Sequence, residues 1–136
     1  MHVQIINFSL NDLTHDAYSD TCNVIAETFA NLPGLISKHW IANPETNTYG
    51  GVYFWESKED MENYLHSEVF EEIANNSAFA EATSKDFAIL EGPTRTTRGI
   101  TWSSDGVRTR FEYYQINLLN QLLSQHTTNS IPTKEG

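Results

Sequence analysis

The stretch GGVYFWESKEDMENYLHSEVF, residues 50–70, decides how this chain folds. It begins with a glycine pair, which is typical of a bulge or a close backbone approach. It continues into Val52-Tyr53-Phe54-Trp55, whose β-branched and aromatic side chains favour a strand. Ser57, followed three residues later by Asp60, is a suitable capping pair for a helix that starts directly after the strand. A strand and a helix joined this closely can form two walls of one aromatic pocket.

Upstream of this stretch, the sequence predicts one strand and one helix. Residues 2–8 carry apolar and polar side chains on both faces, which is typical of a strand with cover on both sides. Between His15 and Leu32, apolar residues recur at steps of three and four, the clearest helical pattern in the chain. These residues are Tyr18, Cys22, Ile25, Phe29 and Leu32. The pair Pro33-Gly34 is expected to end the helix.

Downstream of Gly34, the sequence predicts a hairpin. LISKHWIA, residues 35–42, has the composition of a strand, and NPETN, residues 43–47, is dense in turn-forming residues. The aromatic run then returns, so residues 35–56 are expected to form two antiparallel strands.

After the hairpin, the pattern predicts a broken helix and a last strand. The helix that begins near Ser57 is interrupted around His66-Ser67, and a second helical piece covers Glu68–Asn75. The fourth strand is expected over Thr83–Leu90, before Gly92-Pro93. The order β-α-β-β-α-β is the ferredoxin-like α+β arrangement, in which a four-stranded antiparallel sheet carries helices on one face.

The composition changes after residue 92, which divides the 136-residue chain into a ferredoxin-like domain, 1–92, and an extension, 93–136. Residues 94–110 hold four of the eight basic residues and are expected to form an extended arm. Residues 111–125 have a helical pattern of apolar side chains, and the last residues are expected to be disordered.

The chain is acidic, with 18 Asp and Glu against 8 Lys and Arg and a formal net charge of −10. A negative field repels phosphate backbones, so no nucleic-acid partner is expected. No apolar run approaches membrane-spanning length and no signal peptide is recognisable, so a cytoplasmic protein is expected. Cys22 is the single cysteine, and the five histidines lack metal-ligand spacing, so neither a disulfide nor a metal site is predicted.

The sheet is predicted to be covered on both faces. The run Val52-Tyr53-Phe54-Trp55 places large side chains on both sides of its strand, and such runs indicate cover on both sides. A face-to-face homodimer that forms a barrel accounts for this pattern. Cover by the C-terminal helix of the same chain is the competing explanation.

Three places in the sequence carry a resemblance to a known family. They are Gly34-Leu35 with Lys38 and Trp40, the strand start Gly50-Gly51-Val52-Tyr53, and the helical pair Tyr64-Leu65. At these residues the chain resembles the YdhR-like mono-oxygenases of the dimeric α+β barrel superfamily, which are related to the antibiotic-biosynthesis mono-oxygenases. The resemblance covers roughly residues 2–92.

The resemblance implies oxygen insertion into a small aromatic or polycyclic substrate without flavin, haem or metal. The deprotonated substrate would itself reduce oxygen inside a dry, aromatic cavity. The candidate catalytic residues, which would hydrogen-bond or deprotonate the substrate, are Tyr64, His39 and Asn7. The candidate substrate-binding residues are Trp40, Tyr53, Trp55, Lys38 and Phe70.

Each candidate also has a structural explanation. Trp40 and Trp55 suit core or interface packing, and Lys38 suits an ion pair with a carboxylate. His39 and Trp40 are strand neighbours and point to opposite faces, so only one of them can face the cavity. The alternative function is therefore a non-catalytic dimeric module that binds a small apolar ligand.

Residues 55–70 also resemble the haem-degrading mono-oxygenases of the same superfamily, through the patterns W-x-S-K and S-[DE]-V-F. Asn7 matches the strand asparagine of those enzymes. Tyr64 stands in place of their tryptophan, and Ala74 in place of their axial histidine. Without that imidazole the iron would lack its usual protein ligand, so haem degradation is the less favoured hypothesis.

Overall fold

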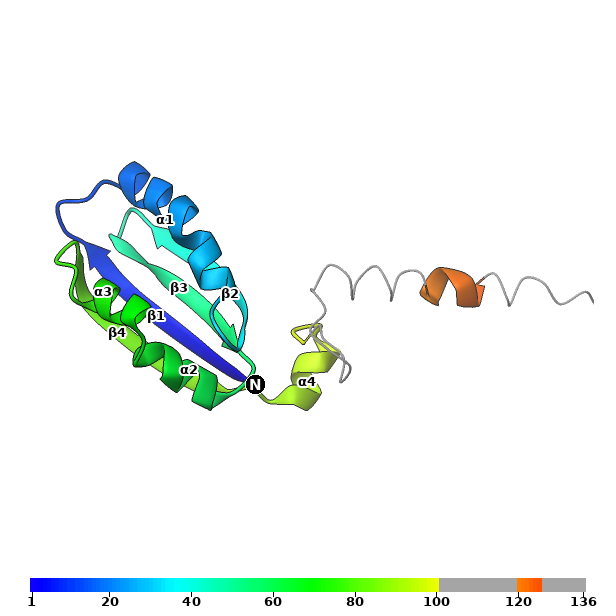
Figure 1. Ribbon diagram of the computed structural model, residues 1–136. Coiled ribbons are helices and arrows are strands. Elements are labelled where there is room, and N and C mark those ends of the chain that lie inside the picture. Colours follow the sequence, from blue (N-terminus) through cyan, green and yellow to red (C-terminus); the bar gives the residue numbers. More distant parts are fainter. Residues whose placement is uncertain (101–119, 126–136) are drawn as a thin grey trace, which may run out of the picture. The chain divides into compact units, whose positions relative to one another are not determined.

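The computed structural model describes residues 1–100 and 120–125 (Figure 1). The chain divides into two compact units, Met1–Ile89 and Leu90–Gly136, and each is considered by itself. In the second unit, residues 120–125 are helical, as expected there. The rest of the predicted helix and residues 101–110 of the predicted arm lie outside the described residues. No helix in the described ranges combines the length and apolar character needed to cross a bilayer.

The first unit contains one antiparallel sheet with the strand order β2-β3-β1-β4. The strands are β1 (His2–Leu10), β2 (Leu35–Asn43), β3 (Thr48–Trp55) and β4 (Phe79–Ala88). The central strand β1 pairs with β3 on one side and with β4 on the other. This order confirms the predicted ferredoxin-like α+β fold.

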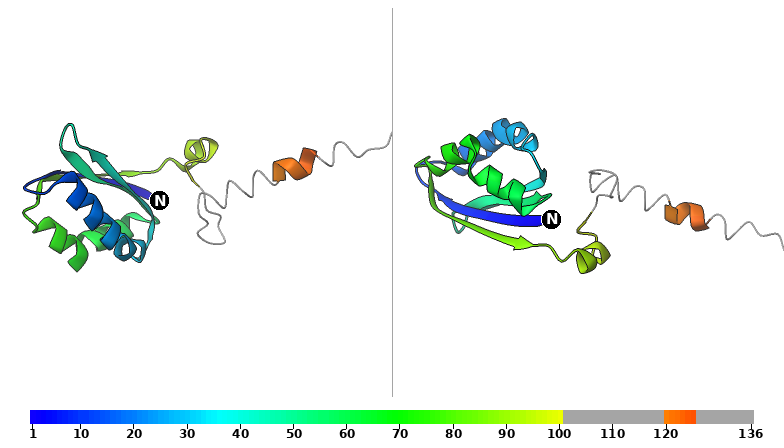
Figure 2. Two further views of the ribbon diagram at one scale, coloured as in Figure 1. Left: turned by 90° about the horizontal axis from the view of Figure 1, so that it is seen from above. Right: turned by 60° about the horizontal axis from the view of Figure 1, so that its bottom comes forward.

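Three helices, α1 (His15–Ala30), α2 (Lys58–Leu65) and α3 (Glu68–Ala74), lie over one face of the sheet (Figure 2). Side-chain caps begin the first two. The Thr14 hydroxyl oxygen accepts a hydrogen bond from the Ala17 N–H at 3.2 Å. The Ser57 hydroxyl oxygen accepts one from the Asp60 N–H at 3.1 Å. Side-chain oxygens thus satisfy N–H groups that have no partner within the first turn.

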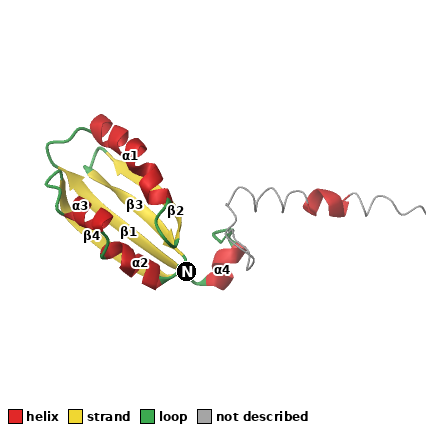
Figure 3. Cartoon of the chain, viewed as in Figure 1, coloured by secondary structure: helices red, strands yellow, loops and turns green. Residues whose placement is uncertain are grey.

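The predicted break near His66-Ser67 separates α2 from α3 (Figure 3). The Ser67 hydroxyl donates to the Tyr64 carbonyl oxygen at 2.6 Å and accepts from the Phe70 N–H at 3.3 Å. Ser67 therefore binds the last turn of α2 and caps the start of α3. This corner fixes the positions of Tyr64 and Phe70 over the sheet.

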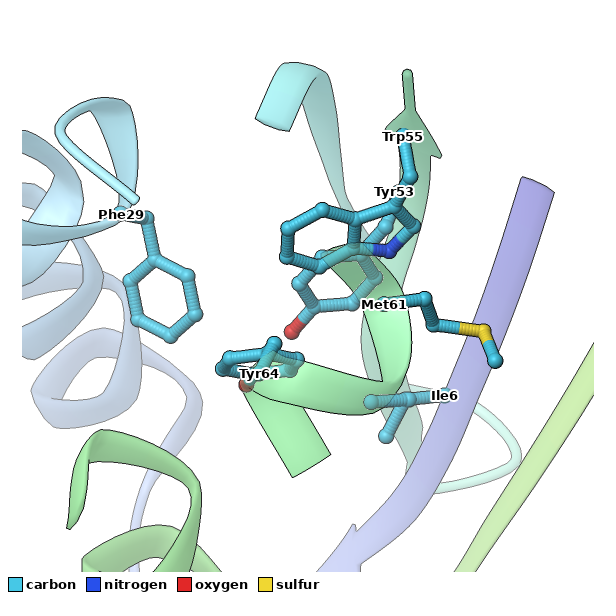
Figure 4. Close-up of a cluster of buried hydrophobic side chains, with 6 residues drawn as sticks. All are labelled: Ile6, Phe29, Tyr53, Trp55, Met61 and Tyr64. Carbon is cyan, nitrogen blue, oxygen red and sulfur yellow. The ribbon is translucent and has the colours of Figure 1, made fainter. Parts of the chain in front are cut away.

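The core lies between the sheet and the helices (Figure 4). It consists of Ile6, Phe29, Tyr53, Trp55, Met61 and Tyr64. Trp55 is fully buried, and its indole N–H donates to the side-chain oxygen of Gln4 at 3.1 Å. The Gln4 amide in turn donates to the Ser84 hydroxyl at 3.1 Å. This chain of bonds satisfies the buried polar groups.

The glycine pair marks a close backbone approach, as expected. Gly50 has a φ of 152°, and a Cβ at this position would overlap the carbonyl oxygen of Ile6 on the neighbouring strand. Only a residue without a side chain lets β3 pair with β1 at this point.

Three predicted boundaries were wrong. The fourth strand is Phe79–Ala88 instead of Thr83–Leu90, because its first half is irregular, with Glu81 at a φ of 54°. The first helix ends at Ala30, two residues before Leu32. The predicted arm begins with a helix, α4 (Glu91–Thr96), since Pro93 lies in the first turn, where its missing N–H costs nothing.

Candidate functional site

A cavity of about 50 Å³ lies between the sheet and the three helices of the first unit. We call it the inner cavity. All four strands and all three of these helices contribute to its walls, which are mainly apolar. The lining residues are Ile6, Phe8, Tyr18, Thr21, Cys22, Ile25, Lys38, Trp40, Gly50, Tyr53, Tyr64, Phe70, Ile73 and Phe79.

Aromatic rings from several elements surround this cavity. Tyr53 on β3 and Tyr64 on α2 have ring centres 5.6 Å apart, and Tyr64 meets Phe70 on α3 edge-on at 5.4 Å. Trp40 on β2 meets Phe29 on α1 edge-on at 5.1 Å. Edge-on and tilted contacts of this kind fix the ring positions.

Lys38 places its ammonium group among these rings. The Lys38 nitrogen lies 3.3 Å from the ring centre of Trp40, 3.5 Å from that of Phe29 and 4.7 Å from that of Tyr53. Among the described residues, no carboxylate lies within ion-pair distance of it. The ring faces stabilise the charged form only in part. Burial dominates and lowers the pKa of Lys38 to about 7.

The tyrosine hydroxyls of the cavity stay protonated at neutral pH. Burial, with the Tyr64 hydroxyl beside it, raises the pKa of Tyr53 far above its usual value. Burial also raises the pKa of Tyr64. Burial and the neighbouring Cys22 thiol raise the pKa of Tyr18. The site therefore offers one titratable cation and several hydroxyl donors in an apolar setting, which suits the binding of an aromatic anion.

Five of the eight candidate residues meet at the inner cavity: Lys38, Trp40, Tyr53, Tyr64 and Phe70. Trp55 lies behind them and does not line the cavity. Its ring stacks parallel to Tyr53 at 6.0 Å, and its N–H is taken by Gln4, so it belongs to the core.

The remaining two candidates, Asn7 and His39, lie on the other face of the sheet. Asn7 stands between Ile6 and Phe8, which both line the cavity, so strand alternation directs its side chain away. His39 likewise stands between Lys38 and Trp40, and its exposed ring meets Phe54 edge-on at 6.1 Å. The structure contradicts the expectation that these two residues act in the cavity.

No site residue was predicted on α1. Tyr18, Cys22 and Ile25 line the inner cavity through the same apolar stripe that predicts the helix. A second feature was also missed: the Nδ1 atom of His15 lies 3.0 Å from the Tyr49 hydroxyl. His15 and Tyr49 are 34 residues apart, so no local pattern indicates their contact.

The residues present do not fit a haem. The inner cavity is smaller than the cavity of about 150 Å³ that takes up benzene in another protein, and a porphyrin is much larger. Among the described residues, no histidine lines it, and His66 is exposed at the end of α2. No group of three or more His, Cys, Asp or Glu side chains in the described ranges could hold a metal ion.

The fold defines a class, the ferredoxin-like α+β proteins. The chain belongs to the ydhR family: the profile of the family described as "Putative mono-oxygenase ydhR" matches residues 3–100. In the comparison with curated proteins, no sequence matches this chain.

Solved structures with the same fold include several oxygenases. One is an antibiotic biosynthesis monooxygenase, with a TM-score of 0.55 and 11% identity over 66% of this chain and 99% of the other. SnoaB, a cofactor-independent oxygenase from Streptomyces nogalater, aligns with a TM-score of 0.53 and 16% identity over 66% and 94%. MhuD, a haem degrader from Mycobacterium tuberculosis, aligns with a TM-score of 0.55 and 17% identity over 66% and 96%. At these identities the likeness establishes the fold.

Proposed function

We propose that the protein is a cofactor-independent mono-oxygenase whose substrate is a small acidic aromatic compound, such as a phenol, a quinol or an anthrone. The observation that carries this proposal is Lys38. A lysine without a carboxylate partner in the described structure, buried against three ring faces, is costly to the fold and suited to an aromatic anion. The ydhR family membership and the shared fold with SnoaB support the choice of oxygen chemistry.

The reaction needs only the substrate and oxygen. The methylene carbon of an anthrone-like substrate loses a proton, and the resulting carbanion passes one electron to molecular oxygen. The substrate radical and superoxide combine through a new carbon–oxygen bond and take up a proton to give a hydroperoxide. This hydroperoxide loses water to form the ketone, so that one oxygen atom enters the product and the other leaves as water.

The cavity residues have separate roles in this scheme. Neutral Lys38 takes the substrate proton, and the ammonium group that forms then stabilises the anion. The Tyr53 and Tyr64 hydroxyls, which stay protonated, donate hydrogen bonds to the substrate oxygen. Trp40 and Phe70 hold the ring and exclude water.

A homodimer through the open face of the sheet is part of the proposal. In the first unit, Val3, Ile5, Val52 and Phe54 are only half-buried on this face, and Phe87 is 52% exposed. A contiguous apolar face of this kind needs cover, and a second copy presents the same face.

Oxygen uptake with a panel of quinols and anthrones, measured with a chelator present, tests the proposed function. We expect uptake with at least one compound, unaffected by the chelator and reduced at least 100-fold in Lys38→Met. Lys58→Met, which removes an exposed lysine from α2, is the matched control and should keep full activity. Absence of uptake with every compound would refute the oxygenase.

The second candidate function is a non-catalytic module that binds a small aromatic ligand. The lining of the inner cavity favours it, because apart from Lys38 none of the described residues there is a histidine or carboxylate that could serve as a general base. Ligand binding that depends on Lys38, without oxygen uptake by any bound compound, is the result that this function predicts.

A further inference from the structure

A second hollow of about 270 Å³ lies between α1 and β2. We call it the α1–β2 groove. Its lining residues are His15, Tyr18, Ser19, Cys22, Asn23, Ala26, Trp40, Ile41 and Ala42. Three of these, Tyr18, Cys22 and Trp40, also line the inner cavity, so the two hollows meet there.

The volumes show that the inner cavity cannot hold a substrate by itself. A cavity of about 150 Å³ takes up a single benzene ring, and the inner cavity has about 50 Å³. An aromatic ring that reaches Lys38 from the inner cavity must therefore extend into a neighbouring hollow. Of the three shared residues, Cys22 has the smallest side chain and so blocks the passage between the two hollows least. We call the passage at Cys22 the neck.

The groove differs from the inner cavity in its chemistry. Its outer part is polar, with the exposed side chains of His15, Ser19 and Asn23 along one face of α1. The contact between His15 Nδ1 and the Tyr49 hydroxyl, 3.0 Å long, fixes the imidazole at one end. None of the lining residues is acidic, although the chain carries a net charge of −10. The groove thus accepts hydrogen-bonding or anionic oxygens.

We propose that the inner cavity and the α1–β2 groove form one substrate site joined at Cys22, and that the substrate is an elongated aromatic compound with oxygens at both ends. The acidic end of the substrate binds at Lys38, and the oxygen of its far end binds in the groove at Ser19 and Asn23. This inference rests on the proposed function and names its substrate class.

A third hollow offers the far end of the substrate a different place. It has about 220 Å³ and shares Lys38 and Trp40 with the inner cavity. Apart from Lys38 and Trp40, which it shares with the inner cavity, Ser37 is the only residue with a polar side chain that lines it in the described structure. The groove is favoured because it offers several hydrogen-bonding side chains where this hollow offers one.

The test compares two ligands that differ in the far oxygen, 1-naphthol and 1,5-naphthalenediol, by calorimetric titration of the full chain. We expect the diol to bind about fivefold more tightly than 1-naphthol, the effect of one hydrogen bond. The double variant Ser19→Ala/Asn23→Ala should abolish this advantage and leave 1-naphthol binding unchanged. Both substitutions are at exposed positions, so the fold should tolerate them. Lys38→Met should weaken the binding of both ligands.

Two control variants locate the effect. Thr28→Ala removes an exposed hydroxyl from α1 outside the groove and should preserve the advantage of the diol. Ser37→Ala, in the third hollow, should also preserve the advantage of the diol.

Cys22 supplies a readout that does not depend on affinity. As the single cysteine, it reports alone on alkylation by iodoacetamide. A ligand that spans the neck should slow its alkylation at least fivefold when the site is saturated. The bound ligand excludes the reagent from the thiol.

Four results would overturn the inference while the proposed function stands. The first is a diol that binds no more tightly than 1-naphthol. The second and third are an advantage of the diol that survives Ser19→Ala/Asn23→Ala, and one that is lost in Ser37→Ala. The fourth is unprotected Cys22 despite Lys38-dependent binding. If neither ligand binds the unmodified protein, the proposed function and the inference both fail.

Discussion

At the scale of single residues, Lys38 couples the candidate site to the stability of the fold. Its pKa falls from 10.5 to about 7 on folding because of burial. Between these values the unfolded chain binds the proton and the folded chain does not. The free energy of unfolding therefore falls as the pH is lowered from 10.5 to 7, and the cost is complete below pH 7.

Lys38→Met should remove this cost. We expect a gain of about 2 kcal/mol at pH 6, less than the full pKa change implies, because the cation–π contacts are lost as well. Urea unfolding at pH 6 and at pH 10.5 measures it, and the gain should vanish at the higher pH. Lys58→Met, at an exposed site, should show no such dependence. A Lys38→Met protein that is less stable at pH 6 would mean that the ring contacts outweigh burial.

Gln4 and Trp55 differ from Lys38, because they stabilise the fold and do not line the inner cavity. Gln4→Met leaves the buried Trp55 N–H without its acceptor, and we expect a loss of about 2 kcal/mol in the free energy of unfolding. Affinity for 1-naphthol should not change. Adding Trp55→Phe removes the orphaned donor, so the double variant should lose less than the sum of the single losses. Additive losses would show that the bond contributes nothing.

At the scale of secondary-structure elements, the α2–α3 corner joins helix capping to the site. Ser67→Ala should cost about 1 kcal/mol as the loss of an N-cap, and should also weaken 1-naphthol binding several-fold. The second effect is expected because Ser67 bonds to Tyr64 and Phe70, which both line the cavity.

Thr14→Ala is the matched control for this corner. Thr14 caps α1 in the same way, away from the inner cavity, so its loss should lower stability by a similar amount and leave affinity unchanged. Equal effects of both substitutions on affinity would show that the corner has no specific role in the site.

The sequence predicted those elements whose apolar pattern is set by burial. The stripe of α1 faces the core, as do Tyr53 and Trp55 of β3, and both elements were predicted at these positions. The first half of β4 escaped prediction because it is an exposed edge strand with an irregular residue at Glu81. Packing does not dictate an alternating pattern on such a strand.

The composition of the site was predictable, and its geometry only in part. Strand alternation separates His39 from Lys38 and Trp40, but it does not say which set faces the helices. On β1 both faces carry apolar residues, so the pattern gave no warning that Asn7 points away from the cavity. The α1 residues that line the inner cavity depend on how the helix packs on the sheet, and the local sequence does not determine this packing.

At the scale of the whole molecule, the two faces of the sheet differ in their cover. Within the first unit, the three helices bury one face, and no helix covers the other (Figure 2). Phe54, Val52 and Ile5 lie on this open face, on neighbouring strands, and are only half-buried. Burying these side chains against a second copy would contribute roughly 25 cal/mol for each Å² of apolar surface removed from water.

Phe54→Glu should therefore dissociate the proposed homodimer. A carboxylate at the centre of an apolar interface loses its hydration without gaining a partner, which costs several kcal/mol, and two such groups face each other in a symmetric dimer. Sedimentation velocity over a range of concentrations should show a dimer for the unmodified chain and a monomer for Phe54→Glu. Val24→Glu is the control, since Val24 is 80% exposed on the helical side, and this variant should remain dimeric. A monomeric unmodified chain would instead favour cover of the sheet by its own C-terminal segment.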